Sequence, residues 1–376
     1  MTLSPRGAAA LQVDVTSLPS EPIETGVTRR GPSAGAGPKV AWGRGLLVSL
    51  LVACAVPAGL GLYADFGDVS TTLGGFQWNL APALLGLTVL NYLVRYVRWR
   101  KLVQLASGQT PGLWQDLLVF FAGTAMILTP ARLGEWVKSY YARQLYGAPV
   151  ARTAPILVVE RIIDILVMLL LAATGLVLFD WDRTVFVAVG VMGVIAIMAL
   201  RHRGLASLLF RGAARFPPTR RLLPPMEDFH DSSRLLLSLP GLSWAFGLGL
   251  VAWSLECLTF FLVLVGLGRP MTWELLIQAG FIFPVASLAG SLSLLPGGLG
   301  VTEGSITAMT QAILDAPRSL AVASALLVRA VILGFGFTLG LAALAILSRA
   351  VANGQAHGQG QAEQQRPLIS DRERCP

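Results

Sequence analysis

The sequence predicts an all-α polytopic integral membrane protein. Composition points to this fold class, because 54% of the residues are hydrophobic and only 13% are charged, against about 25% charged in a typical soluble domain. The order of the residues points the same way. Apolar residues gather into runs long enough to cross a bilayer, and polar or basic loops separate the runs.

Composition also excludes several kinds of site. The cysteines are scattered and the histidines lack a second ligand at a useful spacing, so we expect no disulfide framework, metal or haem. The sequence has no phosphate-binding loop, nucleophile elbow or dinucleotide fingerprint, and we expect no cofactor. The net charge of +8 fits cytoplasmic loops beside anionic lipid, so nucleic acid is not an expected partner.

The chain divides into three parts by composition. Residues 1–40 are rich in Pro, Gly, Ser and Thr, which predicts a disordered cytoplasmic N-terminus. Residues 41–349 form a single membrane domain, and the Gln/Gly-rich residues 350–376 are expected to be a disordered cytoplasmic tail. Lys39 and Arg44 precede the first apolar run, and no cleavage site follows it, so we expect an uncleaved first span.

Hydropathy predicts about six full spans and two shorter or broken segments. The full spans are expected at residues 45–63, 80–97, 153–179, 184–200, 241–266 and 320–347. With this division every basic loop falls on one side, most clearly the loop 201–240 with its arginines. We therefore expect a bacterial-type cytoplasmic (inner) membrane protein with both termini in the cytoplasm.

The first broken segment, 116–129, is too short to span, since 14 residues of helix reach about 21 Å across a core of about 30 Å. Pro130 and a strongly charged stretch follow it. We expect a re-entrant segment that enters from the cytoplasm and turns back at Pro130. If residues 132–139 are helical, Arg132, Glu135 and Lys138 share one face.

The second broken segment is the stretch SLLPGGLGVTEGS, residues 293–305. Proline removes a backbone donor and the glycines weaken the helix, so we expect a helix that enters at 273–295 from outside and breaks at Pro296–Gly298. It restarts near Leu299, with Glu303 in its first turns, and its positive end favours an anionic group. The alternative is a kinked helix packed by glycines, with Glu303 as a buried structural acid.

The two broken segments resemble each other. Each has a Phe-rich approach, a proline turn, a Leu-Gly pair and a carboxylate, and they are expected to enter from opposite sides. Paired interrupted segments of this kind are typical of inverted-repeat transporters, which hold their substrate where the breaks meet. The alternative is a chance likeness between segments rich in Leu, Gly and Pro.

Several ionisable residues fall inside predicted spans, where a charge must be paired or hydrated. We expect an intramembrane charge network of Glu160, Arg161, Asp164, Glu256 and Arg329, with a purely structural pairing as the alternative. Arg329 needs an anionic partner, which Glu256, Glu303 or Asp164 could supply. Asn91 and Arg95 of the second span are further candidates for the headgroup site, with extension of Arg95 to the membrane interface as the favoured interpretation, and Arg98 is expected to mark the cytoplasmic end of that span.

Three motifs resemble the lysylphosphatidylglycerol synthase transmembrane-region family, also called the flippase-like membrane domain family. They are Arg132-Leu133-Gly134-Glu135-x-x-Lys138, Glu160-Arg161-x-x-Asp164 and Leu295-Pro296-Gly297-Gly298-Leu299-Gly300-x-x-Glu303-Gly304. The resemblance covers roughly residues 45–348 and implies re-entrant helices and translocation of a lipid between leaflets. In the full-length synthase a soluble aminoacyl-transferase domain follows, whereas this chain ends in a short polar tail, so aminoacyl transfer is not expected.

The expected function is movement of a lipid with a polar or anionic headgroup between leaflets, without a cofactor and without catalysis. Arg132 and Lys138 would hold the headgroup, while Glu135 and Glu303 orient it or exchange protons. The full expected translocation site is Arg132, Gly134, Glu135, Lys138, Pro296, Gly297, Gly298, Gly300 and Glu303. Two alternatives remain: a scaffold or accessory subunit beside a lipid- or glycan-modifying enzyme, and an intramembrane transferase with Glu135 or Glu303 as general base.

Overall fold

The computed structural model describes the chain except for residues 1–41, 130–134, 180–183, 203–225 and 365–376. The chain divides into two units, Met1–Trp42 and Gly43–Pro376, and apart from Trp42 the helices described below belong to the second. Every regular element in the described ranges is helical, which confirms the predicted all-α class.

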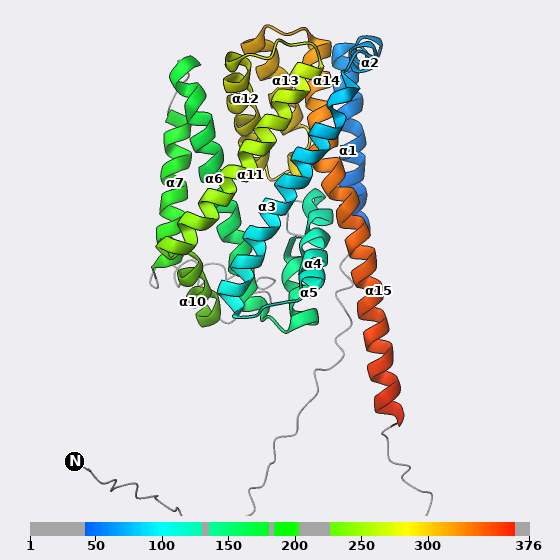
Figure 1. Ribbon diagram of the computed structural model, residues 1–376, viewed down its shortest axis with the longest axis vertical. Helices are drawn as coiled ribbons and strands as arrows, with labels where there is room; N and C mark the ends of the chain where they lie inside the picture. The colour runs from blue at the N-terminus through cyan, green and yellow to red at the C-terminus, as the bar shows by residue number, and fades with distance from the viewer. Residues whose placement is uncertain (1–41, 130–134, 180–183, 203–225, 365–376) are drawn as a thin grey trace, which may run out of the picture. The chain divides into compact units, whose positions relative to one another are not determined.

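The helices follow the chain in an order close to the expected one (Figure 1). They are α1 (Trp42–Ala64), α2 (Phe66–Gly74), α3 (Ala81–Ser107), α4 (Leu113–Ala125), α5 (Val137–Tyr146), α6 (Val150–Phe179), α7 (Thr184–Arg201), α10 (Met226–Leu236), α11 (Leu239–Gly266), α12 (Trp273–Leu292), α13 (Val301–Leu314), α14 (Arg318–Arg329) and α15 (Phe335–Gln364). Three-residue helical turns stand at η1 (Trp78–Leu80), η2 (Met126–Leu128) and η4 (Pro296–Gly298), and a π-helical segment, η5 (Ala330–Gly334), joins α14 to α15.

Four stretches of helix are long and apolar enough to cross a membrane within the part of the chain that is described. They are Trp78–Ser107, Leu239–Gly266, Trp273–Leu292 and Arg318–Ala350. Helices also stand where the other spans were expected, as α1, α6 and α7. The count of six spans and the re-entrant arrangement stay predictions.

Two segments differ from the expected division of the chain. Helix α15 continues to Gln364, so residues 350–364, expected to be disordered, are helical. These residues include alanines and glutamines, which favour helix, and no proline interrupts them before Pro367. Within the predicted basic loop 201–240, the amphipathic helix α10 buries Phe229 and Leu236 and packs against α6 and α3.

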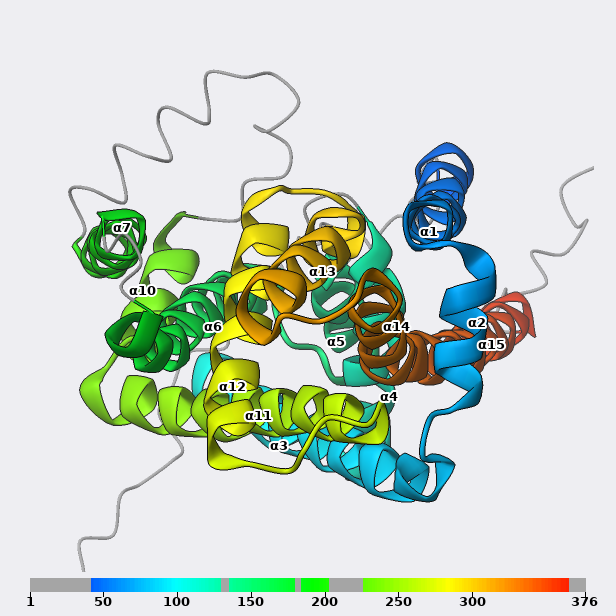
Figure 2. The same ribbon diagram turned by 90° about the horizontal axis from the view of Figure 1, so that it is seen from above.

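Helix pairs far apart in sequence form the core. Helix α3 packs along α11, α12 packs against α6, and α4 packs against α15 (Figure 2). Small residues permit some of these close approaches, as expected where lipid supplies no hydrophobic drive between helices. A side chain at Gly340 of α15 would meet the backbone of Ala125 on α4, and Asn91 of α3 donates to the carbonyl of Ala252 on α11 at 2.6 Å.

The two broken segments meet. In Figure 1, α4 and α5 lie in the lower part of the second unit, while α12 and α13 lie in the upper part. The turn η2, which ends α4, contacts the turn η4, which follows α12. A Cβ atom added to Gly297 would lie 3.1 Å from Leu128 Cδ2, so the contact is direct. The sequence therefore pointed to two segments that are neighbours in space.

The second break depends on glycine. Three of its glycines, Gly297, Gly298 and Gly300, have φ angles of 60°, 67° and 85°, a region that favours residues without a Cβ atom. Gly298 also lies against α12, since an added Cβ would be 3.1 Å from Gly290 Cα and 2.7 Å from Thr302 Oγ1. Gly298 and Gly290 thus let the break fold back against the end of α12.

The substitution Gly298→Ala should destabilise the protein, because it adds a methyl group at a positive φ and against backbone atoms. We expect a loss of about 1–3 kcal/mol, which is typical for backbone strain of this kind. Thermal unfolding in detergent would measure it. Gly304→Ala is the matched control, since Gly304 lies in helix α13 with nothing within 4 Å of its added Cβ. Equal melting temperatures for the two variants would contradict the explanation.

Candidate functional site

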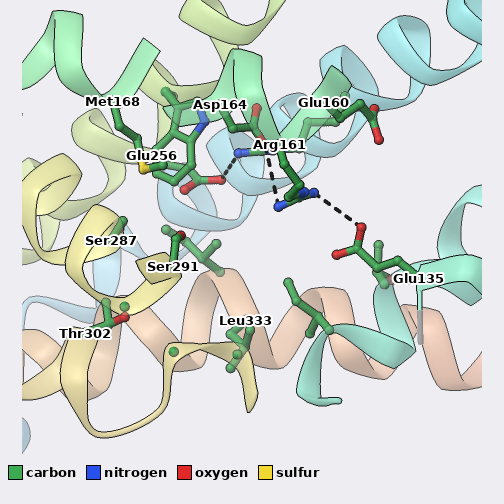
Figure 3. Close-up of a pocket in the computed structure, with 18 of the residues that line it drawn as sticks. Glu135, Glu160, Arg161, Asp164, Met168, Glu256, Ser287, Ser291, Thr302 and Leu333 are labelled. Carbon is green, nitrogen blue, oxygen red and sulfur yellow. Dashed lines mark hydrogen bonds and ion pairs between the residues drawn. The ribbon is translucent and has the colours of Figure 1, made fainter. Parts of the chain in front are cut away.

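A cavity of about 420 Å³ lies where the two broken segments meet the long helices. Its lining comes from α3, α4, α5, α6, α11 and α12, from the break at η4, from Thr302 of α13, and from Arg329 and η5. Figure 3 shows charged side chains of α6 and α11 on one side and the hydroxyl groups of Ser287, Ser291 and Thr302 on another. The cavity therefore combines a charged wall with a neutral polar wall.

The centre of the charged wall is Arg98 of α3, whose side chain is only 2% exposed. Its Nη1 donates to Asp164 Oδ1 at 2.9 Å, and its Nε lies 3.6 Å from Glu160 Oε1. A buried guanidinium requires such partners, because its hydration is lost. Gly249 of α11 makes room for it, since a Cβ there would lie 3.0 Å from Arg98 Nη1.

Arg95 extends the network to α11. Its Nη2 donates to Glu256 Oε1 at 2.8 Å, its Nη1 lies 3.5 Å from Asp164 Oδ2, and its guanidinium stands over the ring of Trp253. The expectation that Arg95 extends to the membrane interface was wrong, and Arg98 is likewise a buried residue rather than a loop marker. The carboxylates of two neighbouring helices supply a closer partner than the interface does.

Arg161 connects α6 with the first broken segment. Its Nη2 donates to Glu135 Oε2 at 3.3 Å, and its Nη1 lies 3.7 Å from Asp164 Oδ2 (Figure 3). The side chain is 36% exposed, while those of Glu135 and Asp164 are buried. Four of the five residues of the expected charge network, Glu160, Arg161, Asp164 and Glu256, are thus linked through arginines around Asp164, which has three arginines within 4 Å, whereas Arg329 pairs with Glu303 instead.

Lys138 of α5 has a different environment. It is 5% exposed, and its ammonium lies 5.0 Å from the ring centroids of both Trp99 and Phe120. Its aliphatic stem crosses Gly123 of α4, where any side chain would collide with it. Cation–π contacts of this kind stabilise a desolvated ammonium by about 2 kcal/mol. Among the described residues no carboxylate lies within ion-pair distance of it.

The second break is held by one ion pair. Arg329 donates from Nε to Glu303 Oε1 at 2.6 Å and from Nη2 to the carbonyl oxygen of Gly297 at 2.5 Å. Glu303 also accepts from the backbone N–H of Gly300 at 2.6 Å. Glu303 is therefore the partner of Arg329 among the three carboxylates that the sequence left open, and its carboxylate caps the restarted helix.

The structure places most of the expected site residues at one cavity. The lining includes Glu135, Lys138, Glu160, Arg161, Asp164, Glu256, Gly297, Gly298 and Arg329. Pro296 is buried beside it, Gly300 begins α13, and Glu303 lies behind Arg329. Arg132 and Gly134 lie outside the described residues.

Sequence reasoning missed Arg98 and Trp253 as site residues and favoured an interfacial position over the site for Arg95. The signal for the two arginines was present, because Asn91, Arg95 and Arg98 recur at the spacing of one helix face. No metal-binding group of three or more His, Cys, Asp or Glu side chains was found in the described part of the chain.

These features define a helical membrane protein with a polar, ion-paired cavity at the junction of two broken segments. The family described as lysylphosphatidylglycerol synthase TM region matches residues 46–340, and the chain belongs to this family. The chain is also 26% identical over 326 residues to the glycosyltransferase AglD of Haloferax volcanii, with 76% of this chain and 52% of the relative covered. It thus spans about half the length of that relative. The name of the family refers to the synthesis of a lipid, and the name of the relative refers to glycosyl transfer.

The Arg98–Asp164 pair can be tested by a double-mutant cycle. Arg98→Met removes the described partner of the buried Glu160 and one of the three arginines beside Asp164, so it should cost about 3–5 kcal/mol of stability. Adding Asp164→Asn removes one of those charges, so the double variant should recover part of the loss. Thermal unfolding in detergent would measure both.

Arg143→Met is the control for this cycle. Arg143 is exposed on α5 and has no ion pair among the described residues, so its loss should change stability little. Strictly additive effects of the Arg98 and Asp164 substitutions would show that the pair is not energetically coupled.

Proposed function

We propose that this protein moves a lipid with a polar or anionic headgroup between the leaflets of a membrane. The observation that carries the proposal is the cavity itself, in which charged side chains of α3, α5, α6 and α11 face the two helix breaks. Ionisable groups at such a place typically mark the path of a polar substrate. Helix breaks that meet at a cavity are typical of transporters.

Lys138, with Arg132 as a second candidate, would hold the headgroup, while Glu135 orients it beside Arg161. Ser287 and Ser291, one helical turn apart on α12, offer hydroxyl groups for neutral parts of the headgroup. Glu303 would act through the break, since its carboxylate holds both Arg329 and Gly300. We also propose a cytoplasmic (inner) membrane location with both termini in the cytoplasm.

Purified protein in liposomes that contain a fluorescent phospholipid tests this proposal. Transport exposes inner-leaflet label to an impermeant quencher, so bleaching should proceed beyond the outer leaflet. Glu303→Gln should slow it by about tenfold or more, because charged hydrogen bonds worth about 1.5–3 kcal/mol each are weakened. Glu274→Gln, at an exposed carboxylate at the start of α12, should transport like wild type.

Two outcomes would count against this assignment. Wild-type liposomes that bleach like protein-free ones would remove the basis for transport. Equal rates for Glu303→Gln and wild type would show that the second break does not take part. Size-exclusion profiles before reconstitution separate lost transport from lost folding.

The second candidate is an accessory subunit of a lipid- or glycan-modifying enzyme. The similarity to a glycosyltransferase favours it, because that relative is about twice the length of the matched part. This function predicts a stable partner enzyme in mild detergent and no transport by the purified chain. Affinity purification from the native membrane, followed by protein mass spectrometry, distinguishes the two candidates.

A further inference from the structure

We infer that the cavity selects lipids whose headgroup carries a net negative charge and rejects cationic headgroups. This inference rests on the proposed function, since it names the substrate class of the same site. Its basis is the difference between the cavity's carboxylates, which are paired, and its lysine, which is not.

The carboxylates that line the cavity all have arginine partners. The pairs are Glu135 with Arg161, Glu160 with Arg98, Glu256 with Arg95, and Asp164 with all three arginines. Glu303, behind the lining, pairs with Arg329. Over the described residues, every carboxylate of the cavity therefore has an arginine within 4 Å, and the one fully buried carboxylate oxygen there without a hydrogen bond, Asp164 Oδ2, lies 3.5 Å from Arg95 and 3.7 Å from Arg161.

Lys138 is the opposite case. Its ammonium lines the cavity and is buried, and two aromatic rings hold it in place of a carboxylate. Aromatic faces attract a cation without neutralising its formal charge. The ammonium can still donate hydrogen bonds to an anion, and the stem is fixed across Gly123, so binding loses little side-chain freedom.

A second unmatched group is also a donor. Trp253 is 8% exposed and lines the same cavity, and its Nε1 has no hydrogen-bond partner in the described structure. An indole N–H can donate but cannot accept. The unmatched charge of Lys138 is complementary to the oxygen atoms of a phosphate group, whereas the indole N–H has almost no accessible surface and adds only that, among the described residues, this wall holds no spare acceptor beside it.

The energetic comparison follows from these pairings. A phosphate oxygen can bind Lys138 while every ion pair of the cavity remains intact. A cationic headgroup must share a carboxylate that already serves an arginine, and it meets the positive charges of that arginine and of Lys138, which is unfavourable. The site is therefore adapted to anionic phospholipid rather than to an aminoacylated lipid with a positive headgroup.

Lipid competition tests the inference. Purified protein in mixed micelles receives equal amounts of phosphatidylglycerol, phosphatidylcholine and ethylphosphatidylcholine, which are anionic, zwitterionic and cationic. Mass spectrometry then measures the lipids that the protein retains. Wild type should enrich phosphatidylglycerol and exclude the cationic lipid. Equal retention of the three lipids by wild type would overturn the inference without any variant.

Lys138→Gln should reduce the enrichment of phosphatidylglycerol by roughly tenfold, the effect of one charged hydrogen bond. Lys138→Arg, which keeps the charge, should retain a preference for the anionic lipid. The matched control is Lys101→Gln, since Lys101 is exposed near the end of α3 and has no ion pair in the described structure. Undiminished enrichment in a folded Lys138→Gln protein would overturn the role of Lys138.

Two further measurements distinguish a failure of the charge selection from a failure of lipid binding or of the proposed transport. Glycerol 3-phosphate in excess carries the charge without acyl chains, so displacement of phosphatidylglycerol by it would overturn the assignment to a lipid. In liposomes, equal transport of all three headgroups would leave the proposed function standing and refute the charge selection. Selective retention without transport would instead refute translocation and support the headgroup site.

Discussion

The free-energy cost of burying charged side chains determines how the long helices of this protein pack against one another. Arg98 is almost fully buried, and it can remain charged there only because α6 places Asp164 and Glu160 beside it. The same requirement brings Glu256 of α11 to Arg95. Helices α3, α6 and α11 must therefore pack in one register, because a shift by a single residue would leave a guanidinium or a carboxylate unpaired. The same ion pairs therefore form the charged wall of the cavity and fix the packing of the long helices.

The second break follows a related rule for the backbone. A helix that stops inside the protein leaves polar groups without partners, and these must be satisfied locally. Arg329 binds the carbonyl of Gly297, and Glu303 binds the N–H of Gly300, so one ion pair satisfies groups on both sides of the break. Because the carboxylate comes from the chain itself, the positive end of α13 is already matched. Among the described cations of the cavity, Lys138, on the other broken segment, has no carboxylate partner.

Family membership and the cavity constrain different properties of this membrane protein. The family match covers the helices from α1 into α15 and establishes the type of protein. The similarity to a glycosyltransferase covers about half of that relative, so its activity does not transfer to this chain. The cavity contributes a charge pattern, because its carboxylates are paired with arginines while the ammonium of Lys138 has no carboxylate partner in the described residues.

The sequence by itself determined the helical class, the approximate bounds of the long helices and the position of the break at Pro296–Gly298, while the turn expected at Pro130 lies outside the described residues. Hydropathy and glycine or proline content report local preferences, and the environment of a membrane leaves few alternatives to helix. The sequence also identified most of the charged residues of the cavity, because ionisable side chains in apolar runs are rare. Only the tertiary structure decided which charges pair. Arg95 and Arg98 looked like residues of the membrane boundary, and Arg329 had three possible partners. Pairing depends on which helix faces which and at what rotation, and these properties arise from contacts between residues far apart in the chain.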